Sequence, residues 1–82
     1  MTTTNLIKKL NKLNIPYTII DCNGYNMDIQ FIINSRTYKA GFFKGEELIQ
    51  DFCREIAWDK KEQEMIRRFF KNFAQLYKYA TN

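Results

Sequence analysis

Two cysteines, Cys22 and Cys53, carry the most reactive side chains that the sequence offers. The chain has no histidine and no C-x-x-C pair, so it lacks the sulfur and imidazole ligand sets typical of zinc and iron–sulfur sites. Cys53 stands among apolar residues, and no histidine is present to activate it as a nucleophile. The sequence therefore predicts no metal site and no thiol catalysis.

Acid–base chemistry and cofactor binding have equally little support. The carboxylates Asp21, Asp28, Glu62 and Glu64 could in principle hold a divalent ion, but they are scattered along the chain. The three glycines form no Gly-x-Gly-x-x-Gly or phosphate-binding loop. A general acid–base enzyme needs titratable groups that converge in a cleft. We therefore expect a protein that is not an enzyme and has no cofactor.

The basic side chains gather in two regions, although the net charge is only +4. We expect both regions on helix surfaces, where they could form one patch that neutralises phosphates. The alternative interpretation is a solvated surface without a ligand. The candidate nucleic-acid-binding residues are Lys8, Lys9, Lys12, Arg67, Arg68, Lys71 and Lys78.

The acidic side chains concentrate between these basic regions, since residues 46–64 hold seven acidic and three basic residues. A face of this kind could dock a basic partner or only solubilise the chain. Trp58 stands within this segment, at the expected break between two helices. An exposed tryptophan is often a binding hot spot, although Trp58 could also fill the helix junction. The candidate protein-docking residues are Trp58, Glu47, Asp51 and Glu55.

The elements predicted for the first half of the chain are one helix and three strands. Leu6 and Leu10 lie on one side of a helix that ends before Pro16. β-Branched, aromatic and alternating residues predict strands over 17–22, 25–33 and 37–43. Asn-Gly at 23–24 and Asn-Ser at 34–35 predict the turns between them.

Helical spacing of apolar residues dominates the second half. The apolar arc of a second helix holds Leu48, Ile49, Phe52, Cys53 and Ile56, and that of a third holds Met65, Ile66, Phe69, Phe70, Phe73, Leu76 and Tyr77. Glu46 and Glu47 suit the start of a second helix, and Asp59 with Glu62 fits a cap for a third helix that runs to about Tyr79. The alternative is one unbroken helix of about 34 residues over 46–79, because the apolar residues also keep a heptad spacing. Such a helix could form a homodimer.

These elements predict one α+β domain over residues 1–82, in the order α-β-β-β-α-α. A three-stranded antiparallel sheet with the helices packed on one face is the natural arrangement. The composition supports a folded core, because 45% of the residues are hydrophobic and 16% are aromatic.

The predicted order resembles two kinds of protein. Over roughly residues 4–57 it is similar to the double-stranded RNA-binding domain, in which a lysine-rich start of the second helix contacts RNA. Lys44 stands at that position, and Glu46 and Glu47 follow where the family has lysines. The full order is similar to a phage anti-CRISPR inhibitor of Cas9, which implies a protein partner.

From these observations we expect a non-enzymatic protein-binding module, a small regulator or inhibitor of phage or mobile-element origin. Nucleic-acid binding and homodimerisation through the C-terminal helix are the alternatives. No apolar run reaches the roughly 20 residues of a membrane span, and two cysteines are few for a secreted scaffold. The expected location is the cytoplasm, without membrane contact.

Overall fold

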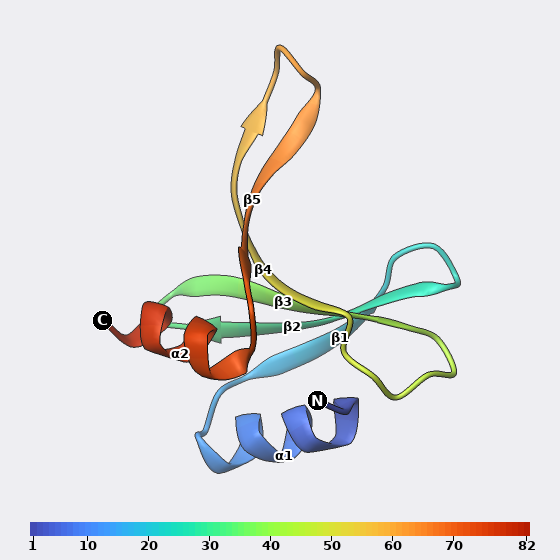
Figure 1. Ribbon diagram of the computed structural model, residues 1–82, viewed down its shortest axis with the longest axis vertical. Helices are drawn as coiled ribbons and strands as arrows, with labels where there is room; N and C mark the ends of the chain where they lie inside the picture. Colours follow the sequence, from blue (N-terminus) through green and yellow to red (C-terminus); the bar gives the residue numbers. More distant parts are fainter.

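The computed structural model describes residues 1–82 and contains one five-stranded antiparallel sheet with two helices. Sheet order follows chain order, so each strand pairs with the next one along the sequence (Figure 1). The strands are β1 Tyr17–Asp21, β2 Asn26–Ile33, β3 Arg36–Phe43, β4 Asp51–Asp59 and β5 Glu64–Phe70.

The helices are α1 Thr3–Lys12 and α2 Phe73–Thr81. Thr2 caps α1 by accepting a hydrogen bond from the Asn5 amide at 3.1 Å. Asn72 caps α2 in the same way, by accepting from the Gln75 amide at 2.9 Å. Such side-chain acceptors satisfy amides that have no partner within the first turn. Neither helix is long and apolar enough to cross a membrane.

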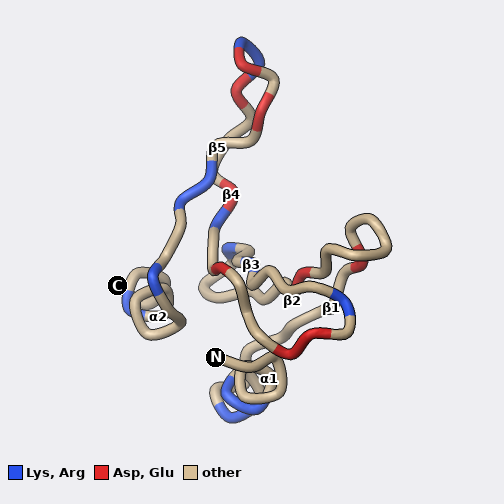
Figure 2. Tube along the Cα trace, turned by 45° about the vertical axis from the view of Figure 1, so that its right-hand side comes forward, with Lys and Arg blue, Asp and Glu red and all other residues tan.

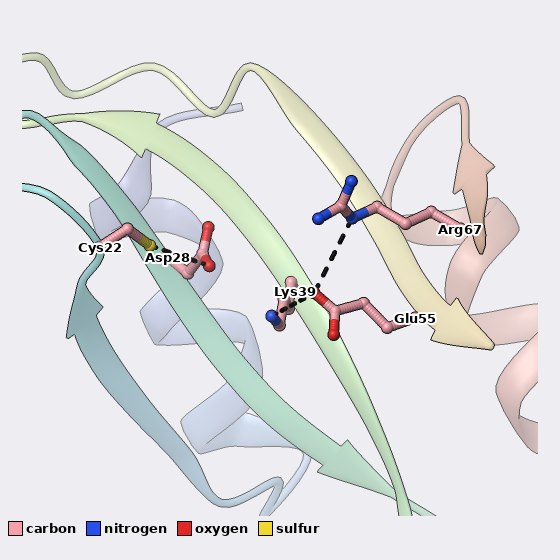
Figure 3. Close-up of polar contacts among 5 residues, drawn as sticks. All are labelled: Cys22, Asp28, Lys39, Glu55 and Arg67. Carbon is pink, nitrogen blue, oxygen red and sulfur yellow. Dashed lines mark hydrogen bonds and ion pairs between the residues drawn. The ribbon is translucent and has the colours of Figure 1, made fainter. Parts of the chain in front are cut away.

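Both helices pack against the same face of the sheet. Leu6 and Leu10 of α1 and Leu76 of α2 are fully buried beside Phe31 and Tyr38 of the central strands. The alternation along β2 and β3 places these strand residues on one face, and the opposite face carries Asp28 and Lys39 without a covering helix (Figure 3). The sheet is therefore covered on one side only.

The elements predicted for the first half of the chain are confirmed to within about a residue. Gly24 adopts φ 84° in the first turn, and Asn34 and Ser35 adopt φ 51° and 65° in the second. Positive φ at both central residues of a two-residue turn is the geometry that joins antiparallel strands with the right twist. Local turn chemistry and strand alternation therefore determine this half.

The predicted three-stranded sheet and the helix over 46–56 are wrong. Residues 44–50 form a connection, and β4 begins at Asp51. Phe52 and Cys53 follow each other in sequence and are both buried, but in a strand they point to opposite faces. The helical spacing of Phe52 and Cys53 with Ile49 and Ile56 therefore does not correspond to the buried side of a helix.

The predicted helix from Asp59 to about Tyr79 is also wrong over most of its length. Asp59 ends β4 and holds a hairpin turn, β5 follows, and helix begins only at Phe73. The element order is α-β-β-β-β-β-α, and the unbroken helix over 46–79 does not exist. The expected order of a double-stranded RNA-binding domain is lost because β4 stands where its second helix was predicted.

The β4–β5 hairpin extends away from the rest of the domain (Figure 1). β4 pairs with β3 only at three positions, from Lys39–Cys53 to Gly41–Asp51, whereas its pairing with β5 continues to Asp59–Glu64. A bulge between Glu55 and Ala57 interrupts that ladder. We call residues 54–68 the arm, because they reach beyond the three-stranded part of the sheet.

Candidate functional site

The arm presents large apolar side chains to solvent. Ile56, Trp58 and Ile66 are 53%, 55% and 47% exposed. Trp58 pairs with Met65, and the neighbouring pair joins Ala57 to Ile66, so these two pairs lie on opposite faces of the ribbon. None of these side chains belongs to the hydrophobic core. The arm therefore offers apolar surface that the domain does not use for its own packing.

The tip of the arm has a defined turn. Oδ1 of Asp59 accepts hydrogen bonds from the amides of Lys61 and Glu62, at 2.9 and 3.2 Å. Gln63 completes the turn with φ 54°. Residues of both charges, Lys60 and Lys61 as well as Glu62 and Glu64, lie around this tip (Figure 2). The Asp-x-x-Glu pattern here is a turn signal, because an aspartate can bond the same following amides in a turn as at a helix start.

An ion-pair network joins the root of the arm to the sheet on the face that no helix covers. Glu55 of β4 lies between Lys39 of β3, at 2.5 Å, and Arg67 of β5, at 3.8 Å from Nε (Figure 3). The Lys39 and Glu55 side chains are partly buried, which reduces solvent screening of their attraction. This contact holds β4 against β3 beside the last paired residues, Lys39 and Cys53.

A second set of contacts secures the root on the helix-covered face. Nη1 of Arg54 donates to the Tyr79 hydroxyl at 3.1 Å. The Arg68 guanidinium lies 4.6 Å from the centroid of the same tyrosine ring, within cation–π range. Tyr79 also packs against Phe70, with ring centroids 5.2 Å apart. Helix α2 thereby contacts the root of the arm through Tyr79.

The two cysteines border the hollow on the uncovered face, which has a volume of about 320 Å³. Burial raises the pKa of the Cys53 thiol to about 11. Partial desolvation, together with the hydrogen bond and charge of Asp28, raises the pKa of Cys22. Both groups are therefore protonated thiols at neutral pH, and a thiol is a far weaker nucleophile than its thiolate.

The predicted docking residues do not share one helical face. Glu47 lies in the connection before β4, where its carbonyl accepts from the Thr3 amide at 2.6 Å. Asp51 and Glu55 lie on β4, and Glu55 is engaged in the ion pairs with Lys39 and Arg67. Trp58 lies near the arm tip and is exposed, so it does not fill a helix junction. Docking through these residues stays a prediction.

The predicted nucleic-acid-binding residues are dispersed over several elements. Lys8, Lys9 and Lys12 are exposed on α1, as expected. Lys9 approaches the ring of Phe73 at 5.6 Å, which brings α1 next to the start of α2.

The basic residues of the second set are separated from one another. Arg67 and Arg68 are consecutive on β5 and point to opposite faces of the sheet. Lys71 precedes α2 and Lys78 lies on it. The structure therefore does not form the single patch on helix surfaces that the sequence analysis considered, and phosphate binding by these residues stays a prediction.

The sequence interpretation missed Ile56 and Ile66 as exposed residues, because it placed both on buried helix stripes. A signal was available in the five polar residues at 60–64, which separate two stretches rich in aromatic and β-branched residues. A polar run of this kind between two such stretches is typical of a hairpin. Comparisons with protein-family models, curated proteins and solved structures found no match for this chain.

Proposed function

We propose that this protein is a non-enzymatic protein-binding module that docks through its arm, with Trp58 as the central contact. The observation that carries the proposal is the exposure of Trp58, Ile56 and Ile66 on an element outside the hydrophobic core. Full burial of one such side chain by a partner would contribute about 1.5–3 kcal/mol to binding. A small regulator or inhibitor that acts in the cytoplasm fits such a module.

The chemistry of the arm specifies the partner surface. Tryptophan is enriched among hot-spot residues because it buries a large area with few rotatable bonds. The tip beside it carries Lys60 and Lys61 together with Glu62 and Glu64. We therefore expect a partner protein with an apolar pocket for Trp58, bordered by charges of both signs.

A site-specific cross-link tests this proposal. Trp58 is replaced by the photoreactive residue p-benzoylphenylalanine, and Tyr25 is replaced in a matched control. Tyr25 is 57% exposed on the β1–β2 turn, so the two positions are equally accessible. We expect irradiation in native host extract to give one protein adduct from position 58 and none from position 25.

Competition then separates docking from chance contact. Wild-type protein should suppress the adduct, whereas Trp58→Ala should compete at least about 30-fold less well if Trp58 is a hot spot. The same variant should change the free energy of unfolding by less than about 0.5 kcal/mol, because Trp58 lies outside the core. Equal adducts from both positions, or equal competition, would contradict the proposal.

A further inference from the structure

The sheet divides into a fork where β3 and β4 separate. Their pairing ends at Lys39–Cys53, after which β4 continues with β5 into the arm. β3 keeps its pairing with β2 as far as Arg36–Ile33 (Figure 1). A hollow of about 340 Å³ opens between the two strands, and no hydrophobic residue lines it.

Basic side chains dominate this fork. The lining residues are Ser35, Arg36, Thr37, Lys39, Arg54 and Glu55. The one acidic group, Glu55, is already neutralised by Lys39 at 2.5 Å. Neither Arg36 nor Arg54 forms an ion pair with any carboxylate, and Arg54 bonds only to the neutral Tyr79 hydroxyl. Two guanidinium groups thus remain uncompensated beside two hydroxyl side chains.

A third arginine increases the positive potential at the same place. Arg54 lies directly opposite Arg68 in the β4–β5 ladder. Like charges in directly opposed positions destabilise an antiparallel pair unless another group offsets them. The Tyr79 ring offsets part of the Arg68 charge, but no carboxylate does so. A bound anion would relieve this repulsion.

We propose that the fork binds a phosphate group of a nucleic-acid backbone. Guanidinium groups bind phosphate oxygens in a bidentate manner, and Ser35 and Thr37 can donate further hydrogen bonds. The wholly polar lining leaves no surface to hold a base or an acyl chain, unlike the mainly apolar pockets of small-molecule sites. The rest of the ligand must therefore contact other parts of the protein surface, which a polymer can do. The net charge of +4 also attracts a polyanion.

This site is separate from the apolar docking surface. It lies at the root of the arm and does not include Trp58, so the inference does not depend on the proposed protein partner. It also differs from the basic residues predicted from the sequence, because Arg36, Lys39 and Arg54 are not among them.

Fluorescence anisotropy with labelled duplex and single-stranded DNA and RNA, measured across a salt series, tests the inference. The variant is the double substitution Arg36→Gln and Arg54→Gln. The matched control is Lys60→Gln with Lys61→Gln, which removes the same charge at the arm tip. We expect the fork variant to bind at least about tenfold more weakly, with a log–log salt slope shallower by about two. The tip variant should stay within about twofold of wild type.

Two additions make the result decisive. Arg36→Gln alone leaves the Arg54–Tyr79 contact intact, and it should still reduce affinity if the fork binds phosphate. Inorganic phosphate and a phosphoserine peptide are tested as competitors in the same assay. Equal losses in the fork and tip variants would overturn the site, and so would the absence of binding at about 50 mM salt. A phosphopeptide that binds the fork when no nucleic acid does would overturn the nucleic-acid assignment.

Discussion

Tyr38 shows how a single buried polar atom can lower the stability of this core. Its side chain is fully buried, and its ring packs against Phe31 and Phe70 at centroid distances of 6.0 and 6.2 Å. The hydroxyl is buried and has no hydrogen-bond partner. A buried polar group without a partner costs about 1–3 kcal/mol, because it loses its bonds to water. The Tyr38 ring therefore stabilises the core, whereas its unpaired hydroxyl lowers the free energy of unfolding.

Tyr38→Phe should therefore raise the free energy of unfolding by about 1 kcal/mol. Tyr79→Phe is the matched control with the opposite expected sign, because the Tyr79 hydroxyl accepts a hydrogen bond from Arg54. Loss of this hydrogen bond should lower the free energy of unfolding by about 1 kcal/mol or more, since the donor is charged. Urea denaturation of both variants measures the difference. Destabilisation by Tyr38→Phe would show that the hydroxyl has a partner.

At the scale of elements, the sequence determines the first half of the chain more clearly than the second. Strands 17–43 are joined by turns of Asn, Gly and Ser, whose side chains tolerate the positive φ that the structure adopts. In the second half Phe52 and Phe70 are buried, but they are opposite one another across a ladder. Their helical spacing is incidental, and tertiary pairing overrides it.

The candidate site was predictable only where a single residue type carried the signal. Trp58 was identified because a tryptophan outside a buried stripe suggests binding, and the structure leaves it exposed. The fork could not be predicted, because Arg36 and Arg54 come together only when β3 and β4 meet and separate. No spacing along the chain encodes such a contact.

The arm should open more readily than the rest of the sheet, since β4 and β5 beyond the bulge pair only with each other and bury little apolar surface. Asp59→Ala removes both side-chain bonds that hold the turn. We expect amide hydrogen exchange over residues 57–66 to become about five-fold faster, for a loss near 1 kcal/mol. Exchange in β2 and β3 should not change. Equal acceleration in both regions would show that the arm opens only with the whole domain.

At the scale of the whole molecule, the core and the exposed apolar surface of the arm are formed by different parts of the chain. The buried core takes its residues from both helices, from Ile15 and from strands β2 to β5, and none from the distal arm. The C-terminal helix in particular buries Phe73, Leu76 and Ala80 within its own domain. The apolar face that a helix-mediated homodimer would need is thus occupied, and self-association would have to use the arm instead.

Sedimentation equilibrium distinguishes these possibilities. We expect a monomer of 9.9 kDa at micromolar concentration, because α2 buries its apolar face in the core and the arm is narrow. A standard protein interface buries about 800 Å² per partner, and a short hairpin supplies that area only by entering a matching pocket. A dimer that persists in Trp58→Ala would show that the chain self-associates through a surface other than Trp58. A dimer that dissociates in Trp58→Ala would identify a second copy of this chain as the partner of the arm, and would replace the heterologous partner proposed above.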